Sequence, residues 1–158
     1  MLRALLLCCV VALMSCGGVK ANENSDSPVR GEVLVGATDT AQYMPLLRGK
    51  RVAVLANHTA MFSSEEHIVD MMHREGISLA GIFAPEHGFR GSIEAGAIVK
   101  NSVDERTGVP ILSLYTGTKK RPSDDVMRSF DVLVVDMQDV GLRFYTYYIT
   151  MLQIMDAC

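Results

Sequence analysis

The 158-residue sequence contains no tryptophan, and only 6% of its residues are aromatic. With 15 basic and 18 acidic side chains, it also lacks the positive charge that proteins use to neutralise nucleic-acid phosphates. A hydrophobic content of 49% excludes intrinsic disorder, and 13 glycines with 5 prolines exclude a collagen-like or proline-rich chain. We therefore expect one globular domain of ordinary size and no nucleic-acid partner.

Several chemical signatures are also absent. No GxGxxG or P-loop pattern follows a strand-like run, and no GxSxG motif places a nucleophilic serine. The four cysteines leave no pair for a disulfide in the mature chain, because two lie in an apolar leader and the others are Cys16 and Cys158. No Cys/His spacing is typical of a zinc site, so we expect no metal and no other cofactor.

The chain begins with a sequence typical of bacterial export. Arg3 precedes an apolar run over residues 4–14, which is far shorter than the ~20 residues of a membrane-spanning helix. Leu13-Met14-Ser15-Cys16 resembles the lipobox of bacterial lipoproteins. We expect a signal peptide over residues 1–15 and a lipid on Cys16 that anchors the exported protein to a membrane, facing the periplasm or the cell surface. Plain secretion is the alternative.

The sequence after the leader divides into a tether and a folded domain. Residues 16–30 are small and polar and predict a flexible tether, and residues 31–158 predict the domain. Four continuous apolar runs are typical of parallel strands covered on both faces. These runs are residues 51–56, 77–84, 109–115 and 130–136.

Amphipathic stretches between and after these runs predict helices, beginning near Ser63, Pro122 and Tyr145. The alternation predicts an open, mostly parallel α/β sheet with right-handed crossovers. Glu32–Ala37 could add an edge strand, and Tyr43–Leu47 a short helix. The last helix reaches the chain end with no following strand, so we expect the amino-terminal part of a longer protein.

Polar side chains follow each predicted strand, at the edge where α/β sheets bind ligands. Glu86 follows a buried strand and Pro85, and burial beside Phe89 would favour the protonated form that a general acid needs. The alternative for Glu86 is a structural pair with Arg90 or a cap. Four segments carry these groups: residues 57–59, 85–91, 115–117 and 136–141.

Two further interpretations concern Asp136, which ends the run VLVVD. It occupies a position typical of a functional acid in α/β proteins, although a cap or an ion pair with Arg143 explains it equally well. His58, His87 and Asp136 also allow a metal-dependent hydrolase as an alternative function.

Two motifs resemble the exo-β-N-acetylmuramidase family, the NamZ-like or YbbC-like glycoside hydrolases. The motifs are FAPEHGFRG at residues 83–91 and DMQDVGLRFYTY at residues 136–147, with shorter matches at residues 49–52, 56–59 and 107–115. The resemblance implies a Rossmann-like catalytic domain, of which residues 31–158 are an incomplete amino-terminal part, followed by a second, smaller domain. Such a fragment is expected to be inactive alone.

The resemblance further implies release of N-acetylmuramic acid from the non-reducing ends of peptidoglycan fragments during cell-wall turnover and recycling. Glu86 would be the catalytic acid, and Asp136 or Asp139 a second carboxylate if one is required. His58 departs from the glutamine more common in the family. The residues expected to bind the saccharide or muropeptide are Asn57, His87, Arg90, Tyr115, Gln138, Asp139, Arg143 and Tyr145. A non-catalytic cell-wall-binding lipoprotein is the alternative.

Overall fold

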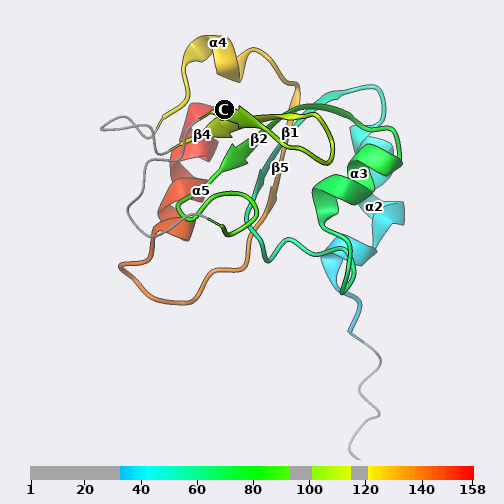
Figure 1. Ribbon diagram of the computed structural model, residues 1–158, viewed down its shortest axis with the longest axis horizontal. Coiled ribbons are helices and arrows are strands. Elements are labelled where there is room, and N and C mark those ends of the chain that lie inside the picture. Colours follow the sequence, from blue (N-terminus) through cyan, green and yellow to red (C-terminus); the bar gives the residue numbers. More distant parts are fainter. Residues whose placement is uncertain (1–32, 93–100, 115–120) are drawn as a thin grey trace, which may run out of the picture. The chain divides into compact units, whose positions relative to one another are not determined.

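The computed structural model describes residues 33–92, 101–114 and 121–158, and Leu34–Cys158 form one unit (Figure 1). The first elements are the 3-10 helix η1 (Gly36–Thr38), α2 (Thr40–Leu47), β1 (Arg51–Ala56), α3 (Ile68–Arg74) and β2 (Ser78–Ala84). They are followed by β3 (Ser102–Val103), β4 (Pro110–Ser113), α4 (Asp124–Met127), β5 (Val132–Asp136) and α5 (Thr146–Ala157).

The sheet has the strand order β3-β4-β2-β1-β5. β1 pairs in parallel with both β2 and β5, β2 pairs in parallel with β4, and only the short β3 is antiparallel. From β1 the chain moves outwards through β2 to β4, and β5 then returns to the other side of β1. This reversal confirms the predicted mostly parallel, Rossmann-like sheet and creates a switch point between β1 and β5, where such sheets bind ligands.

Alternating side chains along the strands build two separate cores, one on each face of the sheet. Val52, Val54 and Ile82 point to the face covered by α2 and α3. Ala53, Leu55 and Phe83 point to the opposite face, with side chains of α4 and α5. The helices accordingly flank the sheet on both sides (Figure 1). Strand β1 is buried from Val52 to Ala56, which explains its uninterrupted apolar sequence.

Helix α3 begins at a different residue from the one that its sequence predicts. Ser63 accepts backbone hydrogen bonds from Glu65 and Glu66 at 3.3 and 3.1 Å, forming a turn of its own. The cap of α3 is His67, whose Nδ1 accepts from the Val69 N–H at 3.2 Å. Serine is a common N-cap residue and histidine is not, which is why the sequence predicts a helix start near Ser63 and not at His67.

The expectation of an edge strand at Glu32–Ala37 is wrong for the described residues. Val33, Leu34 and Val35 are mostly exposed and pair with no strand in the described part of the chain. The Val35 carbonyl instead accepts the Thr38 N–H at 2.9 Å and starts η1, and the Tyr43 hydroxyl donates to the Ala37 carbonyl at 2.6 Å. Local turn formation therefore replaces strand pairing. The helix expected at Tyr43–Leu47 is confirmed within α2.

Among residues 33–92, 101–114 and 121–158, no helix combines the length and the apolar character that crossing a membrane requires.

Candidate active site

The loops that follow β1, β2 and β5 meet the start of α5 at the carboxyl edge of the sheet. The loops after β1 and β2 carry Asn57 and Glu86, Asp136 is the last residue of β5, and α5 begins at Thr146. β1 lies between β2 and β5, so Asn57 occupies the centre of this edge. The parallel arrangement therefore gathers residues that are up to 90 positions apart into one region.

Glu86 lies in a tight turn directly after β2. The Gly88 N–H donates to the Pro85 carbonyl at 2.9 Å and closes the turn around Glu86 and His87. His87 has a φ of 70°, in the left-handed region, which places it as the third residue of a type II turn. Such a conformation costs a non-glycine residue on the order of 1 kcal/mol, so the surrounding fold must impose it.

The side chain of Glu86 is directed to the start of α5. Thr146 donates from Oγ1 to Glu86 Oε2 at 2.9 Å, in a half-buried position. The sequence left open a structural pair between Glu86 and Arg90. The observed partner of Glu86 Oε2 is Thr146 instead. Glu86 thus combines partial burial with a fixed hydrogen-bond donor, as a catalytic carboxyl requires.

Asn57 is completely buried beside this turn. Its Oδ1 accepts from the Thr59 N–H at 3.0 Å and from the Thr59 hydroxyl at 2.6 Å. Its Nδ2 makes no hydrogen bond of good geometry in the described part of the chain, although it lies near the Tyr147 hydroxyl. Burial raises the pKa of Tyr147, and the neighbouring Asn57 amide opposes this rise.

Thr59 joins the two loops at the switch point. Its Oγ1 accepts from the Gln138 N–H at 2.9 Å, so the loop after β5 is tied to the loop after β1. The Gln138 side chain is exposed. Its predicted contact with a saccharide stays a prediction, but the backbone of Gln138 already has a structural role.

Asp136 faces the side of the sheet covered by α2 and α3. It lines a cavity of about 360 Å³ with Tyr43, Ile68 and Met72. Burial raises the pKa of Asp136, the nearby His67 opposes this rise, and Oδ2 has no hydrogen-bond partner among the described residues. Among those residues, Asp136 and Arg143 do not form the ion pair that the sequence left open.

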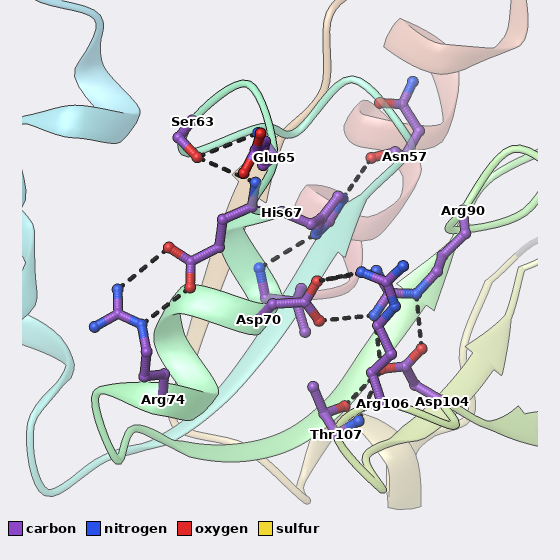
Figure 2. Close-up of polar contacts among 12 residues, drawn as sticks. Asn57, Ser63, Glu65, His67, Asp70, Arg74, Arg90, Asp104, Arg106 and Thr107 are labelled. Carbon is purple, nitrogen blue, oxygen red and sulfur yellow. Dashed lines mark hydrogen bonds and ion pairs between the residues drawn. The ribbon is translucent and has the colours of Figure 1, made fainter.

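Arg90 is the centre of an ion-pair network that joins α3 to the segment around β3 (Figure 2). Its guanidinium donates to Asp104 at 2.8 and 2.9 Å and to Asp70 at 2.8 and 3.2 Å. Burial alone would lower the pKa of Arg90, but these hydrogen bonds raise it. Burial likewise would raise the pKa of Asp104, and the bonds from Arg90 and Thr107 lower it instead.

An aromatic contact connects this network to the site. The Arg90 guanidinium lies 4.5 Å from the centre of the Phe89 ring, and Phe89 packs edge-on against His67 at 4.7 Å. Asp70 and Asp104 both accept hydrogen bonds from the Arg90 guanidinium, so in this structure Arg90 has a structural role. Its predicted contact with substrate stays untested.

The loop between β5 and α5 contains four of the predicted binding residues, of which Gln138 is described above. Asp139 Oδ1 accepts from the Gly141 N–H at 2.7 Å and shapes this loop. Arg143 is exposed and makes no ion pair or hydrogen bond within the described residues. Tyr145 packs edge-on against Tyr147, with ring centres 4.9 Å apart.

The histidines of the alternative metal site do not converge in the described part of the chain. No group of three or more His, Cys, Asp or Glu side chains there is placed to hold a metal ion. His58 packs against Gly91, where an added Cβ would lie 2.9 Å from the His58 ring. Cys16 and Tyr115 lie outside the described residues.

Sequence reasoning missed four residues that build this region: Thr59, His67, Thr146 and Tyr147. Thr59 and Thr146 both lie within the motifs named above. Thr59 is close to Asn57 in the sequence, and Thr146 is near the predicted start of a helix, and these positions could have indicated their roles. The role of His67 had no local signal, because its partner Asn57 lies ten residues earlier.

Comparison with known proteins identifies the family. Residues 52–158 match the family model described as exo-beta-N-acetylmuramidase NamZ, N-terminal. The chain is 43% identical over 116 residues to the peptidoglycan beta-N-acetylmuramidase NamZ of Bacillus subtilis, which covers 73% of this chain and 28% of that protein.

Two crystal structures of DUF1343-family proteins from Bacteroides fragilis share the fold. One has a TM-score of 0.66 at 47% identity and covers 79% of this chain and 31% of the other. The second has a TM-score of 0.65 at 34% identity, with coverages of 75% and 29%. The chain thus spans under a third of the length of these relatives. Because residues 52–158 match the amino-terminal family model, the chain belongs to the NamZ family of exo-β-N-acetylmuramidases.

Proposed function

We propose that the full-length protein is an exo-acting glycoside hydrolase that releases N-acetylmuramic acid from the non-reducing ends of peptidoglycan fragments. A lipid on Cys16 would hold it at a membrane, where it would act in cell-wall turnover and recycling. The 158-residue chain carries one wall of the site and, by this proposal, needs the remaining length found in its relatives for turnover.

The observation that carries this proposal is the position of Glu86. It stands at the carboxyl end of β2, half-buried, in a constrained turn and hydrogen-bonded to Thr146. Glycoside hydrolysis needs a carboxylic acid that protonates the oxygen of the leaving group as an oxocarbenium-like transition state develops. Glu86 has the surroundings for this role.

The sheet geometry bears on the second group in the reaction. β2 and β5 are separated by β1, so adjacent-strand spacing places their axes about 9–10 Å apart. Asp136 lines a cavity with side chains of α2 and α3, whereas Glu86 bonds to the start of α5, the helix whose side chains join the core on the other face. A carboxylate pair about 5 Å apart, as retaining enzymes use, does not match this placement. We therefore favour participation by the 2-acetamido group of the substrate, or a water-mediated role for a second acid.

The deciding experiment is Glu86→Gln in the full-length protein. Turnover of a poorly activated N-acetylmuramoyl substrate should fall by roughly 10²–10⁴, because Gln cannot donate the proton. An aryl glycoside with a good leaving group needs less protonation and should lose less. Unchanged turnover of the poor substrate would remove Glu86 from the mechanism.

The same variant separates an enzyme from a non-catalytic binding lipoprotein. An enzyme loses rate and keeps its affinity for the sugar, which calorimetry with N-acetylmuramic acid measures. If the parent protein binds the sugar and shows no turnover of any N-acetylmuramoyl substrate, the binding function is correct instead.

A further inference from the structure

We propose that Thr146 is a positioning residue that orients the carboxyl of Glu86, an inference that rests on the proposed general-acid role of Glu86. The two residues are 60 positions apart, and the 2.9 Å bond from Thr146 Oγ1 to Glu86 Oε2 joins the second loop of the sheet edge to α5. This contact directly links the two family motifs in the sequence.

The start of α5 holds the Thr146 hydroxyl in place. Thr146 is the first residue of the helix, and its carbonyl accepts the Thr150 hydroxyl at 2.7 Å. Tyr147 and Thr150 are only 3% and 1% exposed, so the first turn is fixed against the core. A β-branched side chain on a fixed backbone has few rotamers, which limits the directions open to Oγ1.

The direction of this hydroxyl does not serve the helix itself. A threonine hydroxyl caps a helix from the N-cap position, which in α5 belongs to Tyr145. Tyr145 makes no side-chain capping bond, and Thr146, the first helical residue, donates to Glu86. The hydroxyl of Thr146 is therefore used for the carboxyl of Glu86 and not for capping the helix.

Glu86 needs such a contact because the turn fixes only its backbone. The closed turn from Pro85 to Gly88 sets where the side chain begins, but a glutamate has three further rotatable bonds. A donor on Oε2 selects the rotamer in which Oε1 carries the proton. After that proton has moved to the leaving group, the same hydroxyl stabilises the new carboxylate.

The test compares three variants of the full-length protein on a poorly activated N-acetylmuramoyl substrate. Thr146→Val keeps the shape and removes the donor, and kcat should fall about 10- to 100-fold with KM changed less than about threefold. Thr146→Ser keeps a hydroxyl and should restore kcat to within about fivefold of the parent. Thr150→Val makes the same change one turn later, and should lower stability without a comparable loss of kcat.

A double variant shows whether Thr146 acts through Glu86. Glu86→Gln/Thr146→Val should be no slower than Glu86→Gln alone, because the residue that Thr146 orients has lost its function. Additive losses, a kcat for Thr146→Val equal to that of Thr150→Val, or a Thr146→Ser variant as slow as Thr146→Val would each overturn the inference. If Glu86→Gln itself keeps full turnover, the proposed function of Glu86 fails, and that result is distinct from a failure confined to Thr146.

Discussion

His67 donates a hydrogen bond from Nε2 to the carbonyl oxygen of Asn57 at 2.8 Å, while its Nδ1 accepts the Val69 N–H. Both ring nitrogens are thus used, in the neutral tautomer protonated at Nε2. One buried side chain caps α3 and also holds the residue at the centre of the candidate site. The position of Asn57 therefore depends on the start of α3 (Figure 2).

Replacing His67 should destabilise the fold and remove a pH dependence. His67→Ala loses the cap and leaves the buried Asn57 carbonyl without its donor, at a cost of about 2–4 kcal/mol in the free energy of unfolding. Ser123→Ala, which removes the exposed cap of α4, is the matched control and should cost about 1 kcal/mol or less. Urea unfolding of the full-length protein measures both.

The pH dependence follows from the environment of His67. Burial lowers its pKa in the folded state, whereas the unfolded value is 6.5. The unfolded chain therefore binds the proton first, and stability falls as the pH drops below 6.5. His67→Asn, a capping residue that does not titrate, should flatten this part of the stability profile. An unchanged profile would assign the dependence to another group.

Arg90→Met should cost about 2–4 kcal/mol, because it leaves Asp104 without its counter-charge and leaves Asp70 with only the 3.4 Å pair to the exposed Arg106. The Asp104 side chain is only 4% exposed, so water cannot replace Arg90 there. Arg90→Lys should recover little, since a single ammonium does not reproduce two paired contacts. Arg74→Met, which breaks surface pairs with Glu66 and Glu75 at a 55% exposed side chain, is the control and should change stability by less than about 1 kcal/mol.

Acid should weaken the same Arg90 network. The folded-state pKa values of Asp70 and Asp104 are lowered from 3.8, so their stabilisation is complete above that pH and is lost as the pH falls further. Arg90→Met should reduce this acid sensitivity in unfolding experiments from pH 5 to pH 2. A variant that unfolds like the parent but loses affinity for the sugar would instead make Arg90 a substrate-binding residue.

Arg143→Ala should change specificity more than fold. Arg143 is exposed and unpaired within the described residues, whereas Arg90 is occupied, so Arg143 is the better partner for the lactyl carboxylate of N-acetylmuramic acid. We expect at least a tenfold loss for N-acetylmuramoyl compounds and little change for N-acetylglucosaminyl compounds. Arg128→Ala, at the C-cap of α4, controls for the loss of a positive charge. An equal loss on both sugars would indicate a structural role.

Local patterns predicted most of the fold, but not the contacts between distant segments. The run Arg51–Ala56 was predicted as a strand with the observed bounds, because five consecutive buried positions leave a clear apolar signal. Glu86 was placed correctly at a strand end for the same reason. Its partner Thr146 and the partners of Arg90 lie 14 to 60 residues away, and no periodicity encodes such pairs. The error at Glu32–Ala37 arose because an apolar run alone does not provide a neighbouring strand.

The central place of β1 also sets the order in which the domain can assemble. Its partner β5 follows about 80 residues later, as the bond between Arg51 and Asp131 illustrates. Closing so long a loop is slow, and pairing over such separations lowers folding rates. Until residues 132–136 arrive, one edge of an apolar, β-branched strand remains open to other chains. A protein of this design would therefore be most prone to aggregation between the emergence of β1 and the docking of β5, and a chaperone that covers residues 51–56 in that interval should raise its yield.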